Sequence, residues 1–282
     1  NSEPNSEPNS EPNSEPNSEP NSDSECSSLS SDSEETFVKI NLFPIQVVAL
    51  EQCKETLDSF LTTCEVSDEE YGCIVIQILM ILITYQKVFG LTHNDLHTNN
   101  IMYVETEKQN LFYIYDGKCY KVPTYGKIYK IIDFGRAIYK FRGSLLCSDS
   151  YHPKGDAATQ YNFEPYFDSN KKRIDPNFSF DLCRLGCALY DMLVEDPEST
   201  KTPIVEIMTN WCLDDKGRNI LYKTNGEERY PEFKLYKMIA RTVHKHIPAE
   251  VIKNSYFEKY VISKKKIRKK KIINIDTLES QQ

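Results

Sequence analysis

The sequence predicts an α+β fold, and this prediction rests on three observations. Residues 71–89 form the most apolar stretch of the chain and have the length of a buried helix. The β-rich runs 111–115 and 118–122 flank Asp116-Gly117, a dipeptide that favours a tight hairpin turn because both positions take positive φ. Residues 180–193 carry an apolar stripe that is typical of a helix. Helices and antiparallel strands are therefore expected in one chain.

Length and charge limit the organisation of the protein. The 282 residues are enough for one large domain or two. Residues 1–36 contain ten acids and no Lys or Arg, so this segment has a formal charge of −10 and the remainder, at about +2, is close to neutral. Residues 1–20 are five copies of Asn-Ser-Glu-Pro. Because such a segment has almost nothing to bury and repels itself, we expect residues 1–36 to be disordered.

Three regions follow from this pattern. The first is the acidic repeat of residues 1–36, the second is a folded region of residues 37–262, and the third is a basic tail of residues 263–282. The chain opens on Asn1 rather than Met, which favours a fragment of a longer reading frame. The nine cysteines include no C-x-x-C pair and no leader peptide is seen, so we expect an intracellular, cytoplasmic location, with the nucleus as the alternative.

The first strands are predicted at residues 37–40 and 45–50 from their β-branched content. The long helix at residues 71–89 should end at Gly90. Its unbroken apolar run is shorter than the 18 or so residues of a membrane span and contains Gln77, so a core helix is predicted and no transmembrane segment.

Strands, loops and helices are expected in turn after residue 100. Strands are expected first at residues 101–104 and 127–132. Residues 138–170 and 211–229 should be loops. Helices are then expected at residues 233–247, ended by Pro248, and at residues 251–261. Cys183 and Cys187 lie four residues apart, a spacing that suits core packing better than a zinc site.

Two polar stretches follow apolar runs in an order that indicates chemistry. In residues 91–102, Asp95 is followed five residues later by Asn100, and residues 131–135 end an apolar run with Asp133, Phe134 and Gly135. Together they resemble the catalytic loop and the metal loop of protein kinases. The 180–193 helix resembles the central kinase helix, in which an aspartate, here Asp181, braces the catalytic loop.

The resemblance implies a fold and an activity. The expected fold is the mainly α-helical lower lobe of a protein kinase, with hinge strands and an enlarged β-hairpin before the Asp-Phe-Gly motif. The expected activity is Mg²⁺-dependent transfer of the ATP γ-phosphate to Ser or Thr hydroxyls of a protein substrate. The hairpin and its context resemble kinases of large DNA viruses, so a virion or an infected host cell would be the setting.

The resemblance also assigns roles to residues. The expected catalytic residues are Asp95 as base, His93 and His97. Magnesium would be held by Asn100 and Asp133, because this hard cation takes oxygen ligands and accepts only one or two from protein. Gly135 and Asp181 would give structural support.

The adenine edge of ATP would be bound by a hinge at Glu51, Gln52 and Cys53. The sequence departs from the kinase pattern upstream of this hinge. A Gly-rich phosphate loop and the upper-lobe lysine are missing, so we expect activity to need an upper lobe encoded upstream. Asn94 stands where kinases have an arginine that answers an activation-loop phosphate, which predicts activity independent of such phosphorylation.

Alternative interpretations stay open at this point. The pattern Asp-Leu-His-x-x-Asn also resembles small-molecule kinases of the aminoglycoside and choline type. A catalytically inactive pseudokinase or interaction module is the third possibility. The seven cations among Lys264–Lys271 could contact nucleic acid or an acidic surface, or form a solvated tail.

Overall fold

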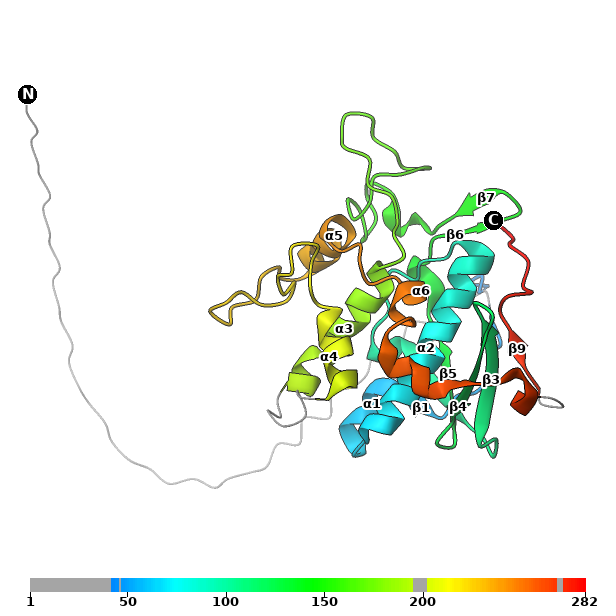
Figure 1. The fold of residues 1–282 in the computed structure, drawn as a ribbon. Helices are drawn as coiled ribbons and strands as arrows, with labels where there is room; N and C mark the ends of the chain where they lie inside the picture. Colours follow the sequence, from blue (N-terminus) through cyan, green and yellow to red (C-terminus); the bar gives the residue numbers. More distant parts are fainter. Residues whose placement is uncertain (1–41, 46, 195–201, 268–270) are drawn as a thin grey trace, which may run out of the picture. The chain divides into compact units, whose positions relative to one another are not determined.

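The computed structural model describes residues 42–45, 47–194, 202–267 and 271–282 (Figure 1). The chain divides into two units, Asn1–Ala49 and Leu50–Gln282. The predicted tail of residues 1–36 and the predicted strand 37–40 lie outside the described residues, as do residues 268–270 of the basic run.

The predicted strand at residues 45–50 is wrong for the residues that the structure describes. Residues 45 and 47–50 form neither strand nor helix. Their apolar side chains, including Ile45, Val47 and Leu50, are each more than 70% exposed, and no described strand pairs with them. A β-branched run without a neighbouring strand has no ladder to join.

Helix α2 (Asp68–Phe89) is the centre of the second unit. It begins at Ser67, whose hydroxyl accepts a hydrogen bond from the backbone N–H of Glu70, and it ends at Gly90 in the left-handed region at φ 56°. By length and composition alone α2 could cross a membrane, but 72% of its most apolar window is buried inside the fold. The prediction of a core helix is confirmed.

Two small sheets pack beside α2 (Figure 1). The first has the order β1 (Glu55–Thr56), β2 (Ile101–Glu105), β5 (Lys127–Ile131), with all pairs antiparallel. The second is built on the predicted hairpin of β3 (Asn110–Tyr115) and β4 (Lys118–Pro123). Asp116 and Gly117 have φ of 50° and 68°, which confirms the predicted turn.

The remaining helices complete an α+β fold. They are α1 (Leu57–Thr63), α3 (Phe180–Val194), α4 (Pro203–Asn210), α5 (Phe233–Thr242) and α6 (Pro248–Val251). Buried apolar side chains of α1, α2, α3 and α4 share a core with those of the two sheets. Residues 211–229 form turns and isolated bridges, as predicted.

Two predicted helices differ from the observed structure. Helix α5 ends at Thr242 and not near Ile247, because the Thr242 carbonyl accepts a hydrogen bond from Asp215 N and the Asp215 carboxylate accepts one from His244 N. The predicted helix at residues 251–261 is replaced by a 3₁₀ segment, Ser255–Tyr260, which starts at a turn where the Asn254 side chain accepts from Tyr256 N. Loop contacts decide both ends.

The expected loop at residues 138–170 contains a short hairpin of β6 (Tyr139–Phe141) and β7 (Ser144–Leu146).

Residues that were expected to form a basic tail are part of the fold. Strand β8 (Val261–Ile262) pairs with β4, and β9 (Ile273–Asn274) pairs parallel with β3. Ile275 is fully buried and Gln281 N donates to the Val88 carbonyl, so the C-terminal residues pack on the hairpin and α2.

Candidate active site

The 91–100 loop and the 131–136 loop lie side by side, although 30 or more residues separate them in sequence. Thr92 and Ile138 exchange backbone hydrogen bonds of 2.9 Å, and Ile132 N donates to the Asn100 carbonyl at 3.0 Å. The pairing of β2 with β5 positions both loops, because β2 starts where the first loop ends and β5 ends where the second begins. The two polar stretches predicted to act together are therefore adjacent.

Asp181 ties the 91–100 loop to α3. Its carboxylate is fully buried and accepts hydrogen bonds from His93 N at 2.9 Å and Asn94 N at 2.8 Å. Burial raises the pKa of this carboxyl, while the hydrogen bonds from the two backbone N–H groups act in the opposite direction. Asp181 lies in the structural position that the sequence predicted for it, bracing the loop backbone.

His93 is completely buried and uses both ring nitrogens inside the protein. Nε2 lies 2.8 Å from the Ile132 carbonyl, and Nδ1 accepts from Asp95 N at 3.3 Å. This pattern requires the neutral tautomer with its hydrogen on Nε2. His93 also packs on the Phe134 ring, with centroids 5.2 Å apart. These contacts make His93 a link between the two loops that also binds the backbone of Asp95.

Asn94 connects three segments of the site. It is fully buried with φ 64°, a left-handed conformation that Asn tolerates better than most residues. Its amide nitrogen donates to the carbonyls of Thr92 and Arg136, and its amide oxygen accepts from the Tyr161 hydroxyl at 2.7 Å. From the sequence, Asn94 was interpreted only as a replacement for the kinase arginine. Its role in packing depends on partners that are distant in sequence, so no local pattern predicts it.

Asp95 is the partly exposed carboxylate of the site, and two side chains hold it. The Tyr236 hydroxyl donates to Oδ1 at 2.6 Å, and Arg136 Nη1 lies 3.7 Å from Oδ2. Tyr236 accepts in turn from Arg184 Nε at 2.9 Å. Its pKa is raised, first by burial and also by the hydrogen bond to Asp95. Sequence reasoning missed Tyr236 and Arg184, because Tyr236 fits the apolar stripe of α5 and neither belongs to a motif.

Asn100 and Asp133 present the oxygen donors of the two loops. The Asn100 amide nitrogen donates to the Asp95 carbonyl at 2.9 Å, so the amide oxygen is the atom that could bind a metal. The exposed Asp133, at φ 58°, accepts from Gly135 N at 3.2 Å. A Cβ on Gly135 would lie 3.2 Å from Asp133 Oδ1, so a side chain there would crowd the carboxylate.

This donor set suits magnesium and suits few other metals. Mg²⁺ prefers oxygen ligands and usually takes only one or two from protein, with phosphate and water completing the octahedron. Within the described ranges no group of three or more His, Cys, Asp or Glu side chains could hold a metal. One Asp and one Asn would not form such a group, and would need a nucleotide to complete the site.

His97 lies in the same electrostatic environment. It is half-buried, and its pKa is lowered by burial and by Arg184, while the charges of Asp95 and Asp133 act in the opposite direction. A neutral imidazole is therefore favoured near neutral pH.

The side chains of the predicted hinge residues Glu51 and Cys53 have partners of their own. Glu51 Oε2 pairs with Lys130 Nζ of β5 at 3.0 Å, and Cys53 Sγ donates to the Glu51 carbonyl. Among the described residues, these side chains make no hydrogen bond to either loop. The buried Cys183 and Cys187 pack in a second core with Cys212, as their spacing predicted.

Comparison with known proteins gives one relative. No protein-family model matches the chain. A protein of Invertebrate iridescent virus 6, Uncharacterized protein 098R, is 26% identical to it over 178 residues. The alignment covers 60% of this chain and 29% of the viral protein, so the chain spans less than a third of that relative's length. This chain is thus similar to part of a viral protein.

Proposed function

We propose that this chain forms the lower lobe of a protein-kinase-like enzyme that transfers the ATP γ-phosphate to Ser or Thr hydroxyls of a protein. The observation that carries the proposal is the joining of three sequence-distant segments, the 91–100 loop, the 131–136 loop and the start of α3, by the buried Asp181 and by His93. In this proposal the joined segments bring the carboxylates of Asp95 and Asp133 and the amide of Asn100 together, an arrangement that a scaffold without chemistry does not need.

The proposed roles follow from the contacts. Asp95, the carboxylate left partly exposed, receives the proton of the acceptor hydroxyl and orients it for attack. Asn100 and Asp133 hold Mg²⁺ through oxygen, and the ion neutralises charge on the phosphates when nucleotide is bound. His93, Asn94 and Asp181 are positioning residues. They fix the backbone of the 91–100 loop, so that little reorganisation accompanies the reaction.

The remaining parts of the proposal come from the resemblance. The hinge at Glu51, Gln52 and Cys53 binds the adenine edge of ATP through its backbone. An upper lobe supplies the phosphate loop and its lysine, which the printed sequence lacks. Runner-up acceptors are small molecules of the aminoglycoside and choline class. Screening a peptide library against a panel of amino sugars and amino alcohols separates the two acceptor classes.

A second candidate function is a non-catalytic interaction module. The observation that favours it is that both Asp95 oxygens already have neighbours, Tyr236 and Arg136, which an acceptor hydroxyl would have to displace or share. In this case the three segments would serve only to organise a surface.

The two functions are separated by assaying the protein expressed from the complete reading frame that encodes this chain. Transfer of labelled γ-phosphate from MgATP is measured for wild type, Asp95→Asn and Asp133→Asn, with Asp191→Asn as control. Asp191 is an exposed aspartate on α3 whose partner is the Tyr222 hydroxyl. We expect a loss of at least about a hundredfold for the two site variants, typical of a removed base or metal ligand, and an unchanged control. Full activity of Asp133→Asn would refute the mechanism, and absence of transfer in the wild type favours the interaction module.

A further inference from the structure

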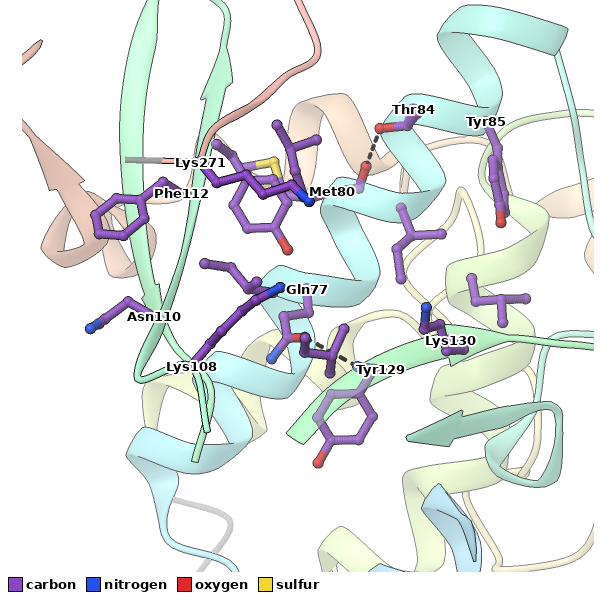
Figure 2. Close-up of a pocket in the computed structure, with 16 residues that line it drawn as sticks. Gln77, Met80, Thr84, Tyr85, Lys108, Asn110, Phe112, Tyr129, Lys130 and Lys271 are labelled. Carbon is purple, nitrogen blue, oxygen red and sulfur yellow. Dashed lines mark hydrogen bonds between the residues drawn. The ribbon is translucent and has the colours of Figure 1, made fainter. Parts of the chain in front are cut away.

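A separate cavity of about 600 Å³ lies between α2, β3, β5 and the C-terminal residues 271–273 (Figure 2). It contains none of the residues of the 91–100 loop. Its volume falls in the range of small-molecule sites, which are typically 300–1,000 Å³. Tyr85 of α2 lies on its wall, and the centroid of its ring is 5.8 Å from that of the Phe134 ring.

The walls of the cavity are mainly apolar. Side chains or backbone of Met80, Ile81, Leu111, Tyr113, Ile128 and Ile131 line it. Two polar side chains of α2 on its wall, Gln77 and Thr84, are hydrogen-bonded inside the protein. The Gln77 amide bonds to the backbone of Lys127 and Tyr129 in β5, and the Thr84 hydroxyl donates to the Met80 carbonyl at 2.7 Å. The wall therefore offers a ligand apolar contact and few hydrogen bonds.

Three lysines from three segments also line this cavity: Lys108 before β3, Lys130 in β5 and Lys271 before β9. Figure 2 shows Lys108 and Lys271 extending from the hairpin side toward α2, while Phe112 is turned away from them. Lys130 pairs with Glu51 at 3.0 Å. For Lys108 and Lys271, the part of the chain that the structure describes places no carboxylate within 4.0 Å, and no Asp or Glu is among the described lining residues.

From this combination we propose that the cavity binds an anionic amphiphile, a molecule with an apolar chain or ring and a carboxylate or phosphate head group. The apolar part lies against α2 and β5, where burial contributes roughly 25 cal/mol per Å². The head group lies between Lys108 and Lys271, whose ammonium groups have hydrogens to donate and, among the residues that the structure describes, no carboxylate within 4.0 Å. An uncharged or cationic amphiphile leaves this positive potential uncompensated.

The experiment measures binding and not phosphoryl transfer, so its outcome is independent of the proposed function. Isothermal titration uses the full chain with dodecanoate, dodecyl phosphate and dodecyltrimethylammonium, each below its micelle-forming concentration. We expect one saturable site for an anionic probe and none for the cationic probe. The two anionic probes distinguish a carboxylate from a phosphate head group, and binding of either supports the site.

The double variant Lys108→Gln/Lys271→Gln tests the head-group contacts. We expect it to weaken anionic-probe binding about tenfold, equivalent to about 1.4 kcal/mol. Lys140→Gln, which removes an exposed lysine of β6, serves as the matched control and should change affinity less than twofold. Unchanged affinity in the double variant would overturn the proposal, as would equal binding of the cationic probe or no binding of any probe.

A cavity-filling variant tests the apolar part. Thr84→Phe places a ring in the cavity from α2 and should abolish binding of dodecanoate without lowering the melting temperature. Should this variant fail to fold, the lysine variants still test whether the cavity binds the anionic probes.

The last experiment uses vesicles that contain anionic lipid. Binding to vesicles without binding of monomeric probe would mean a membrane-facing basic surface and would reject the cavity site.

Discussion

The Tyr236 hydroxyl donates a hydrogen bond of 2.6 Å to Asp95 Oδ1, which joins α5 to the loop that carries the candidate base. Arg184 Nε of α3 donates to the same hydroxyl, so the tyrosine can give its own hydrogen only to Asp95. Because the Tyr236 oxygen accepts from Arg184, its O–H group is oriented toward Asp95. The carboxylate of Asp95 is therefore held by two helices that are far away in sequence.

We expect Tyr236→Phe to reduce kcat about tenfold and to leave the KM for ATP unchanged, because it loosens the base without touching nucleotide. Tyr230→Phe, in the segment before α5, is the matched control. A thermodynamic cycle with Asp95→Ala, which removes the acceptor, should give a coupling of about 1 kcal/mol between the two side chains when measured by urea unfolding. Additive effects in that cycle would contradict the hydrogen bond independently of any activity.

Asp181→Asn should lower the free energy of unfolding by about 2–4 kcal/mol. The amide can accept from only one of the two backbone N–H groups at His93 and Asn94, and its own NH₂ then faces the other. Asp191→Asn on the same helix should cost less than about 0.5 kcal/mol, because that side chain is exposed. Equal effects of the two variants, measured by denaturant titration, would remove the bracing role of Asp181.

Asn94→Ala should lower the free energy of unfolding by about 2–4 kcal/mol, since it leaves the Tyr161 hydroxyl without its acceptor and keeps a positive φ. It also removes one of the two donors to the Arg136 carbonyl, which keeps the Tyr151 hydroxyl. Asn99→Ala, at the exposed neighbouring position in the same loop, is the control and should be nearly neutral. Since Asn94 is buried and fully bonded, it offers nothing to an activation-loop phosphate. Phosphatase treatment of the purified protein should therefore leave phosphoryl transfer unchanged.

The free energy of unfolding should fall above pH 10 because buried tyrosines such as Tyr120 keep their proton in the folded state. Burial, with Glu258 nearby, raises the pKa of Tyr120 to about 12, while in the unfolded chain it ionises near 10. Below pH 10 both states keep the proton, so there is no effect. Above pH 10 only the unfolded state ionises, which favours unfolding by at most about 1.4 kcal/mol per pH unit for one group, up to pH 12. Urea unfolding from pH 8 to 11 should show a shallower decline for Tyr120→Phe, and parallel curves would contradict the assignment.

Local sequence was enough to predict several elements. The apolar run between Ser67 and Gly90 specified α2, and Asp116-Gly117 specified the hairpin, because each signal lies within the element that it forms. The two polar stretches were found in the same way, as short motifs after apolar runs. Asp181 was found as the acid that opens a third apolar stripe. For α2 and the hairpin, a few neighbouring residues contain the physical cause, whereas the role of Asp181 was expected from the resemblance, because its partners His93 and Asn94 are distant in sequence.

Tertiary structure alone decided the features that depend on distant partners. Helix α5 stops at Thr242 because Asp215, 27 residues earlier, takes its last carbonyl. Residues 273–275 leave the basic run and join β3, since an open strand edge and a buried place for Ile275 are available there. The contacts of Asn94, Tyr236 and Arg184 likewise bring together residues that no window of sequence contains. Hydrogen bonds and burial between segments arise only after the chain has closed on itself, so the sequence determined which elements form and the fold decided which side chains meet.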